Sequence, residues 1–204
     1  MNTVPSKLLF LPGASGDTGF WRPAAERLAH PAQQVHIGWP GFGNTPPDPG
    51  VTGMTDLVAR VLPEIDQPTA LVAQSMGGIV AMCAALERPD WVTHLVLTVT
   101  SGGVDMSALG AQDWRPDFAA ANPNLPRWFL DDRTDLSGRL GELHMPVLLL
   151  WGDADPISPV RVGQRLAELL LRAELHVIPN GGHDLGFTHA AEVAGLIDGH
   201  LARD

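Results

Sequence analysis

The chain has 204 residues, of which 45% are hydrophobic and 18% charged, a composition typical of one globular domain. Its formal net charge is −10 with the eight histidines counted as neutral, so it lacks the basic footprint that binds nucleic acid or an anionic membrane surface. The single cysteine excludes an intramolecular disulfide, and residues 1–10 carry no recognisable secretory signal. We therefore expect a cytoplasmic protein.

Short apolar runs alternate along the chain with longer segments of helical period. The expected strands are 7–11, 33–38, 69–74, 93–100, 146–151 and 173–178, and the expected helices are 20–30, 54–65, 76–88, 159–170 and 188–203. This alternation predicts an α/β fold in a single domain over 1–204: about six mostly parallel strands with helices on both faces, a three-layer sandwich. Continuously apolar strand segments are typical of strands buried on both sides.

Residues 102–143 interrupt this alternation and show no clear period. Aromatic side chains and three prolines are spread through the segment. An irregular insertion of this length inside a compact domain is commonly functional, so the segment predicts a short lid over a binding site. The alternative is an irregular excursion whose aromatic side chains simply pack on the core.

A serine, an acid and a histidine follow different strands of the predicted sheet, at the edge where open parallel sheets bind ligands. Ser75 lies in a tight turn between a strand and a helix, which exposes its hydroxyl, although a serine there can also merely cap the helix. Asp153 and Asp155 follow the fifth strand, where turn chemistry alone would explain either of them. His183 follows two glycines after the last strand. Together these residues predict a nucleophile, base and acid triad.

These segments resemble the α/β-hydrolase family. Residues 73–78 (Ala-Gln-Ser-Met-Gly-Gly) are similar to the family's nucleophile elbow, Gly-x-Ser-x-Gly-Gly. Residues 152–159 (Gly-Asp-Ala-Asp-Pro-Ile-Ser-Pro) resemble its acid loop, Gly-x-x-Asp-x-x-x-Pro, and residues 181–183 resemble its terminal histidine loop. The resemblance implies that Asp155, rather than Asp153, is the acid of the triad.

The segment 11–14 (Leu-Pro-Gly-Ala) falls where the family has its oxyanion loop. The resemblance implies that the backbone N–H groups of Ala14 and Met76 form the oxyanion hole. The sequence departs from the family pattern at Ala73, which replaces the first glycine of the elbow, and at Pro12, which replaces the histidine of the oxyanion loop. Its first strand corresponds to the family's third, which implies a trimmed member.

The sequence thus predicts a serine hydrolase that cleaves a small or medium carboxylic ester or thioester through an acyl-enzyme. One alternative is a cofactor-free lyase or C–C bond hydrolase with the same triad, and another is a non-catalytic ligand-binding member of the fold. We expect a small-molecule substrate and neither a cofactor nor a metal ion, because phosphate-loop and His-Glu-x-x-His patterns are absent. The candidates for an apolar substrate pocket are Phe20, Trp21, Trp114, Phe118, Trp128 and Phe129.

Overall fold

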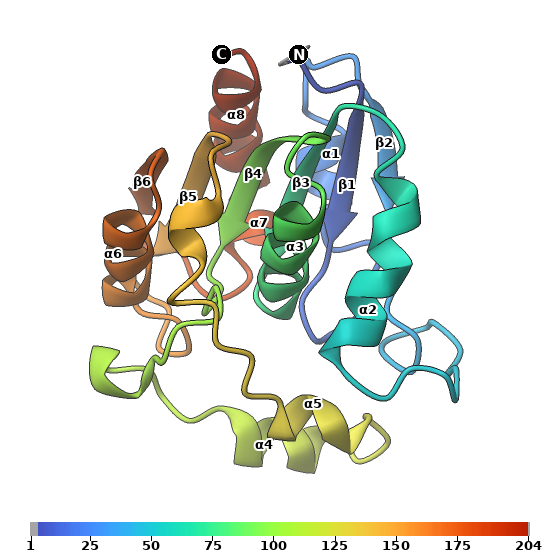
Figure 1. Ribbon diagram of the computed structural model, residues 1–204. Helices are drawn as coiled ribbons and strands as arrows, with labels where there is room; N and C mark the ends of the chain where they lie inside the picture. Colours follow the sequence, from blue (N-terminus) through green and yellow to red (C-terminus); the bar gives the residue numbers. More distant parts are fainter. Residues whose placement is uncertain (1–3, 204) are drawn as a thin grey trace.

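A computed structural model describes residues 4–203, with a parallel β-sheet at its centre (Figure 1). The strands in this part of the chain are β1 (Lys7–Leu11), β2 (Gln33–His36), β3 (Thr69–Gln74), β4 (Val92–Thr98), β5 (Val147–Gly152) and β6 (Ala173–Ile178). All neighbouring strands run parallel, in the order β2-β1-β3-β4-β5-β6. The predicted α/β fold with six parallel strands is confirmed.

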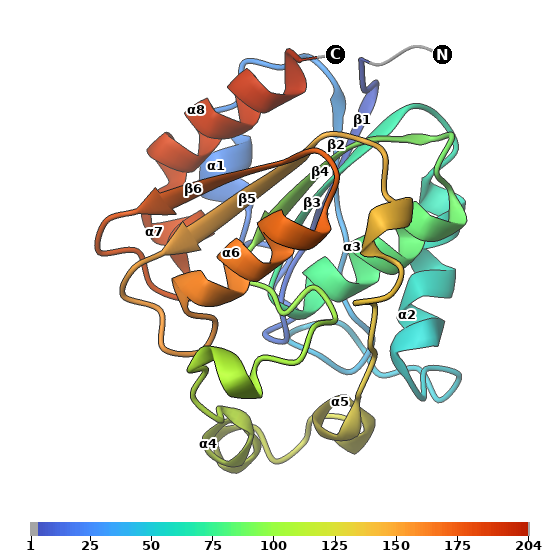
Figure 2. The same cartoon turned by 60° about the vertical axis from the view of Figure 1, so that its left-hand side comes forward.

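Helices cover both faces of the sheet, as two views of the molecule show (Figures 1 and 2). One face carries α2 (Met54–Val61), its continuation η1 (Leu62–Glu64), α3 (Met76–Glu87) and α6 (Val160–Leu169). The opposite face carries α1 (Arg22–Ala25), α7 (Leu185–Thr188) and α8 (Ala190–Leu201). The three-layer arrangement agrees with the prediction. Among residues 4–203, no helix is long and apolar enough to cross a membrane.

The predicted helices differ from the observed ones at one segment and by one additional turn. The helix expected over 20–30 is a single turn, α1. Beyond its end, the N–H groups of Ala29 and His30 donate to the carboxylate of Asp198 on α8, at 2.8 and 3.1 Å, and so do not continue a helix. The helix expected over 188–203 is observed as α8, and the single turn α7 before it was not predicted. The spacing of apolar residues in the sequence predicts neither a contact with a distant residue nor a single helical turn.

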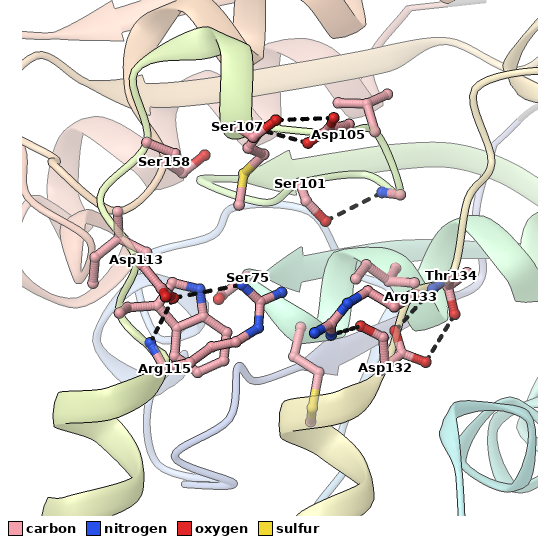
Figure 3. A pocket seen from close by; sticks show the side chains of 18 of the residues that line it. Ser75, Ser101, Asp105, Ser107, Asp113, Arg115, Asp132, Arg133, Thr134 and Ser158 are labelled. Atoms are coloured by element: carbon pink, nitrogen blue, oxygen red, sulfur yellow. Dashed lines mark hydrogen bonds and ion pairs between the residues drawn. The ribbon is translucent and has the colours of Figure 1, made fainter.

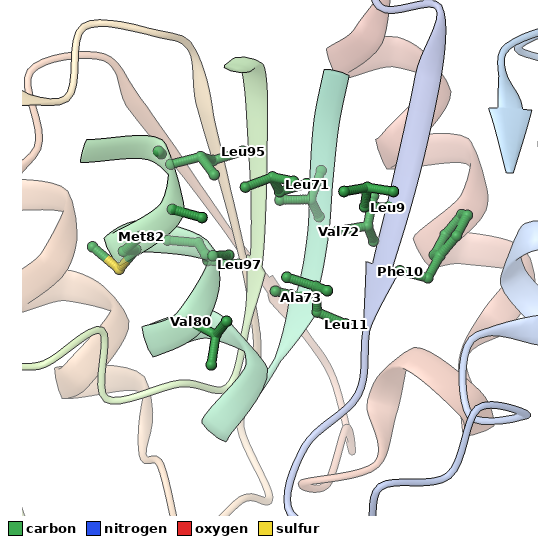
Figure 4. Packing of buried hydrophobic residues seen from close by; sticks show 14 of the residues in the cluster. Leu9, Phe10, Leu11, Leu71, Val72, Ala73, Val80, Met82, Leu95 and Leu97 are labelled. Carbon is green, nitrogen blue, oxygen red and sulfur yellow. The ribbon is translucent and has the colours of Figure 1, made fainter. Parts of the chain in front are cut away.

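The core lies on both sides of the central strands. Parallel register places Leu9 opposite Leu71, Leu71 opposite Leu95, and Leu95 opposite Val147, so one row of apolar side chains crosses four strands. Figure 4 shows part of this row beside α3. Each of these side chains is at most 1% exposed. Burying a side chain of this size stabilises the fold by about 1.5–3 kcal/mol, so this row fixes the relative height of the strands.

Most of residues 102–143, including both of its α-helices, lies beyond the carboxyl ends of the strands, and its last residues run back beside α3 to the start of β5 (Figures 1 and 2). The segment contains α4 (Arg115–Ala121) and α5 (Arg127–Asp131), with the single turns η2 (Ser107–Leu109) and η3 (Leu140–Glu142) on either side. Proline stands in the first turn of α4 and at the N-cap of α5, positions where its missing N–H costs nothing. The segment is therefore partly helical, in turns too short to give a visible period.

A buried histidine pair joins α8 to the sheet. His94 on β4 is 0% exposed and His200 on α8 is 3% exposed. Their rings meet edge to face with centroids 5.1 Å apart. Burial and the neighbouring His94 lower the pKa of His200 to about 4, from an ordinary value of 6.5. Protonating this side chain therefore opposes folding.

We expect this pair to make the fold sensitive to mild acid. Because the unfolded chain binds a proton at His200 below about pH 6.5 and the folded chain resists it down to about pH 4, stability is full above pH 6.5 and falls as the pH drops through this window. This histidine alone lowers the free energy of unfolding by about 2 kcal/mol at pH 5 relative to pH 7.5. Urea unfolding of the wild type and of His200→Phe at both pH values measures the difference. An equal pH dependence in both proteins would contradict the assignment.

Candidate active site

Ser75 lies in a sharp turn between β3 and α3. Its backbone angles are φ 51° and ψ −120°, which a residue with a side chain rarely adopts and which cost about 1–3 kcal/mol. Three contacts hold this conformation: the Ser75 N–H donates to the carbonyl of Thr98 (3.0 Å), and the Ser75 carbonyl accepts from the Gly78 N–H (2.9 Å) and from the Thr100 hydroxyl (2.6 Å). The turn therefore presents the serine hydroxyl beyond the end of the strand.

The turn at Ser75 lies against the end of β1. A Cβ atom added to Gly77 would lie 2.5 Å from the carbonyl oxygen of Pro12 and 2.7 Å from that of Leu11. A Cβ at Gly13 would overlap the side chain of Gln74. The backbones thus approach more closely than any larger residue allows, and this brings the loop after β1 next to the serine.

The acid and histidine loops are likewise joined at glycines. A Cβ at Gly152, the last residue of β5, would overlap the backbone of Gly181. The Ala154 N–H donates to the Gly181 carbonyl (3.0 Å). Asp153 accepts the N–H of Asn180 at 2.6 Å, at a residue whose φ is 58°. Asp153 therefore stabilises the turn before the histidine loop.

Ser75, His183 and Asp155 form a continuous chain of hydrogen bonds. Nε2 of His183 lies 3.0 Å from the Ser75 hydroxyl, and Nδ1 lies 2.8 Å from Oδ2 of Asp155. The other oxygen of Asp155 accepts the N–H groups of Ile157 (2.8 Å) and Ser158 (3.2 Å). The Asp155 side chain is 0% exposed and that of His183 is 24% exposed. These contacts fit the imidazole tautomer with its proton on Nδ1, which leaves Nε2 free to accept the serine proton.

The two residues predicted for the oxyanion hole lie on either side of the serine. Ala14 lies in the loop after β1, and Met76 is the first residue of α3. In the described part of the chain, neither backbone N–H donates to another residue. Both are available to a ligand, and the N-terminus of α3 favours negative charge. Their role in an oxyanion hole stays a prediction.

Two cavities meet at Ser75 and His183. One, of about 580 Å³, is shown in Figure 3 and is called the polar cavity here because charged and hydroxyl-bearing side chains share its lining with apolar ones. The other, of about 530 Å³, is lined mainly by apolar side chains. Both volumes suit a small or medium ligand. Trp114, Phe129 and Ile157 border both cavities and so form the wall between them.

The structure divides the six aromatic candidates into two groups. Trp114 and Phe129 line both cavities, and Phe20 and Phe118 line the apolar one. Trp21 and Trp128 line neither. Trp21 is 1% exposed, and its indole N–H donates to the carbonyl of Leu11 (3.1 Å). Trp128 packs edge to face against Phe42.

Sequence reasoning missed most of the other residues that line the cavities, and four of them bear on the chemistry of the site. Phe187, on α7, borders the apolar cavity and is 51% exposed. Ser101, Arg115 and Arg133 border the polar cavity. The two arginines belong to the segment 102–143, whose aromatic residues alone had suggested a pocket. Two arginines within a segment predicted to cover the site were the sequence feature that could have indicated a binding role for them.

Comparison with known proteins agrees with this fold. The family model described as "Alpha/beta hydrolase family" matches residues 8–196, which is nearly the whole chain. The chain therefore belongs to the alpha/beta hydrolase family. As a member of this family it is an enzyme of the hydrolase class.

The chain is similar to curated proteins of two kinds. It is 30% identical to a pimeloyl-[acyl-carrier protein] methyl ester esterase of Pseudoalteromonas atlantica, over 93% of this chain and 91% of that protein. It is 25% identical to a 2-hydroxy-6-oxononadienedioate/2-hydroxy-6-oxononatrienedioate hydrolase of Cupriavidus pinatubonensis, over 88% of this chain and 79% of that protein. Among solved structures it resembles a thermophilic esterase from Thermogutta terrifontis (TM-score 0.73, 21% identity, 95% of this chain and 88% of that one).

We expect Gly77→Ala to destabilise the protein. The added methyl group has no room between α3 and the end of β1, so the free energy of unfolding falls by about 1–3 kcal/mol. Gly195→Ala on α8 is the matched control: its Cβ meets nothing within 4 Å, and the change raises stability by about 0.5–1 kcal/mol. Urea unfolding of both variants measures the two effects. Equal effects would show that the close approach is not a constraint.

Proposed function

We propose that the protein is a serine hydrolase that cleaves a small or medium carboxylic ester or thioester through an acyl-enzyme. The observation that carries this proposal is the hydrogen-bonded chain from Asp155 through His183 to Ser75 at a strained turn. Each link has the geometry that nucleophilic catalysis needs: a nucleophile within reach of a base, and a base oriented by a buried acid.

In the first half of the proposed reaction, Ser75 Oγ attacks the carbonyl carbon of the ester while its proton passes to Nε2 of His183. The tetrahedral intermediate collapses, the imidazolium gives its proton to the leaving alcohol or thiol, and an acyl-Ser75 remains. In the second half, His183 takes a proton from water, which attacks the acyl group. A second tetrahedral intermediate then releases the carboxylic acid and restores the Ser75 hydroxyl. Asp155 stabilises the imidazolium in both halves.

The oxyanion of each intermediate needs donors already in place. The free N–H groups of Ala14 and Met76 support this role. Donors of this kind contribute about 3–4 kcal/mol each where they have been removed in other enzymes. The buried side of the site strengthens such hydrogen bonds because water competes less for the charge.

We also propose that residues 102–143 form the lid of a single domain. Support comes from its position beyond the carboxyl ends of the strands and from its contribution of Trp114, Phe118 and Phe129 to the cavities beside Ser75. The apolar cavity fits an apolar acyl or alcohol group, because its rings supply contact area with few polar partners. We assign a small-molecule substrate on the volume of the two cavities.

The same triad suits a second reaction, the hydrolysis of a C–C bond next to a carbonyl group. The similarity to the Cupriavidus hydrolase, whose name describes an unsaturated oxo-diacid substrate, favours this candidate over lyase chemistry. Assays with esters, thioesters and an oxo-diacid distinguish the two hydrolytic reactions.

We expect Ser75 to react rapidly with a fluorophosphonate probe. The free imidazole nitrogen at 3.0 Å takes the serine proton as the bond to phosphorus forms. Intact mass and peptide mapping locate the adduct, with Ser75→Ala and His183→Ala as controls. In an ester assay each of these variants should lose about 10⁴-fold or more in kcat. Labelling at another residue, or full ester turnover by Ser75→Ala, would overturn the proposal.

We expect the two aspartates after β5 to differ sharply. Asp155→Asn should lower kcat by about 10⁴-fold, because the amide no longer holds the imidazole in the required tautomer. Asp153→Asn keeps an oxygen that can accept the Asn180 N–H, so turnover should stay near that of the wild type. Steady-state kinetics on one ester measures both. A larger loss of kcat in Asp153→Asn than in Asp155→Asn would show that Asp155 is not the acid of the triad.

A further inference from the structure

The polar cavity beside Ser75 is lined by six charged side chains of the segment 102–143. They are four aspartates and two arginines: Asp105, Asp113, Asp132, Asp135, Arg115 and Arg133. Acids outnumber bases, so the cavity attracts neither sign strongly at long range. What it binds depends on which of these groups still has hydrogen-bonding capacity facing the cavity.

Three of the aspartates bond within their own loops. Asp105 accepts both the N–H and the hydroxyl of Ser107, at 2.9 Å each. Asp132 accepts the N–H and the hydroxyl of Thr134, and Asp135 accepts the N–H and the hydroxyl of Ser137. These bonds lower the pKa of the Asp105 and Asp135 carboxyls. The three acids thus act as turn-forming groups, each with two of its acceptor positions used by the loop.

The two arginines have donors to spare. Arg115 stacks on Trp114 with its guanidinium carbon 5.2 Å from the ring centroid. Its nearest carboxylate, on Asp113, is 3.6 Å away, too far for a good hydrogen bond. Its Nε is buried and bonds no partner within residues 4–203. Because Nε is closed off from solvent, the donors available to a ligand are the N–H groups on the two Nη atoms, which make no hydrogen bond within residues 4–203.

Arg133 approaches from the other side of the cavity. Its Nη1 donates to the carbonyl oxygens of Leu130 (3.1 Å) and Asp132 (2.7 Å). These bonds orient the guanidinium and leave its other N–H groups without a bond to the described part of the chain. Figure 3 shows the guanidinium groups of Arg115 and Arg133 extending towards one another in the middle of the pocket, with Ser75 nearby.

We propose that Arg115 and Arg133 together bind a carboxylate of the substrate, so that the enzyme acts on esters whose other end is a free acid. This inference rests on the proposed function, which places the ester carbonyl at Ser75. Two planar guanidinium forks match the planar carboxylate. A single negative charge also suits the cavity better than a phosphate dianion, because the four aspartates outnumber the two arginines and so disfavour each additional negative charge.

The surrounding acids determine how this recognition works. Since the cavity carries more negative than positive groups, the anion gains little from long-range attraction, and the gain comes from short charge-assisted hydrogen bonds. The preference for an acid-bearing ester therefore appears in KM and survives moderate salt. Electrostatic steering would instead disappear as ionic strength rises.

The test compares matched substrates. Monomethyl esters of dicarboxylic acids from succinate to suberate are assayed beside methyl esters of monocarboxylic acids and of ω-amino acids with the same carbon counts. We expect the acid-bearing ester of the best length to have the highest kcat/KM. Arg115→Gln and Arg133→Gln should each raise its KM about tenfold, and the double variant about a hundredfold, with little change for the neutral ester.

Arg127→Gln is the matched control, since this exposed arginine starts α5 and lines neither cavity. It should leave all three substrate series unchanged. Equal KM effects on neutral and acid-bearing esters, or a preference for the amino ester, would overturn the carboxylate site while leaving the hydrolase intact.

Calorimetric binding to Ser75→Ala separates the two proposals. If Ser75→Ala binds the acid-bearing ester and the double arginine substitution abolishes this binding, the carboxylate site is supported. If the wild type nevertheless hydrolyses none of these esters, ester hydrolysis is contradicted. If Ser75→Ala binds acid-bearing and neutral esters equally well, while the wild type hydrolyses neutral esters through Ser75, only the carboxylate site is contradicted and the hydrolase proposal stands.

Discussion

The structure depends on the close approach of backbones at the carboxyl ends of β1, β3 and β5. Gly77 touches the end of β1, and Gly152 touches the backbone of Gly181. A side chain at any of these points would separate the loops by the width of a methyl group or more. The distances from serine to imidazole and from imidazole to carboxylate, 3.0 and 2.8 Å, exist only because the loops that carry the three residues lie in contact.

The fold was predictable because the central strands β1, β3 and β5 are short and largely apolar, a pattern that is visible in the sequence. The order Ser75, Asp155, His183 along one edge follows once the strands are recognised as parallel. The path of residues 29 and 30 was not predictable, since their N–H groups bond Asp198, far away in the chain, instead of a helix carbonyl. The segment 102–143 also resisted analysis, because its helices span one or two turns and their positions depend on contacts with the rest of the fold.

The sequence could name aromatic residues for the pocket but could not place them. Trp21 and Phe20 are neighbours in sequence, yet their roles differ. Phe20 borders the apolar cavity, whereas Trp21 lies in the core and donates its indole N–H to the Leu11 carbonyl. An aromatic residue near a site in sequence supplies either substrate contact or structural support, and only the direction of its side chain separates the two.

The two departures from the family pattern, Pro12 and Ala73, lie in this tightly packed region at the end of β1. The carbonyl of Leu11 accepts from Trp21, and the carbonyl of Pro12 accepts from the indole N–H of Trp39 at 2.9 Å. The two tryptophans thus satisfy the acceptors that end β1, while proline fixes one backbone angle and has no N–H left to satisfy. Ala73 lies opposite Leu11 in the sheet and is 0% exposed, so its methyl group is packed into the core. The loop before Ala14 is held by buried donors on one side, which leaves its N–H groups on the other side for a ligand.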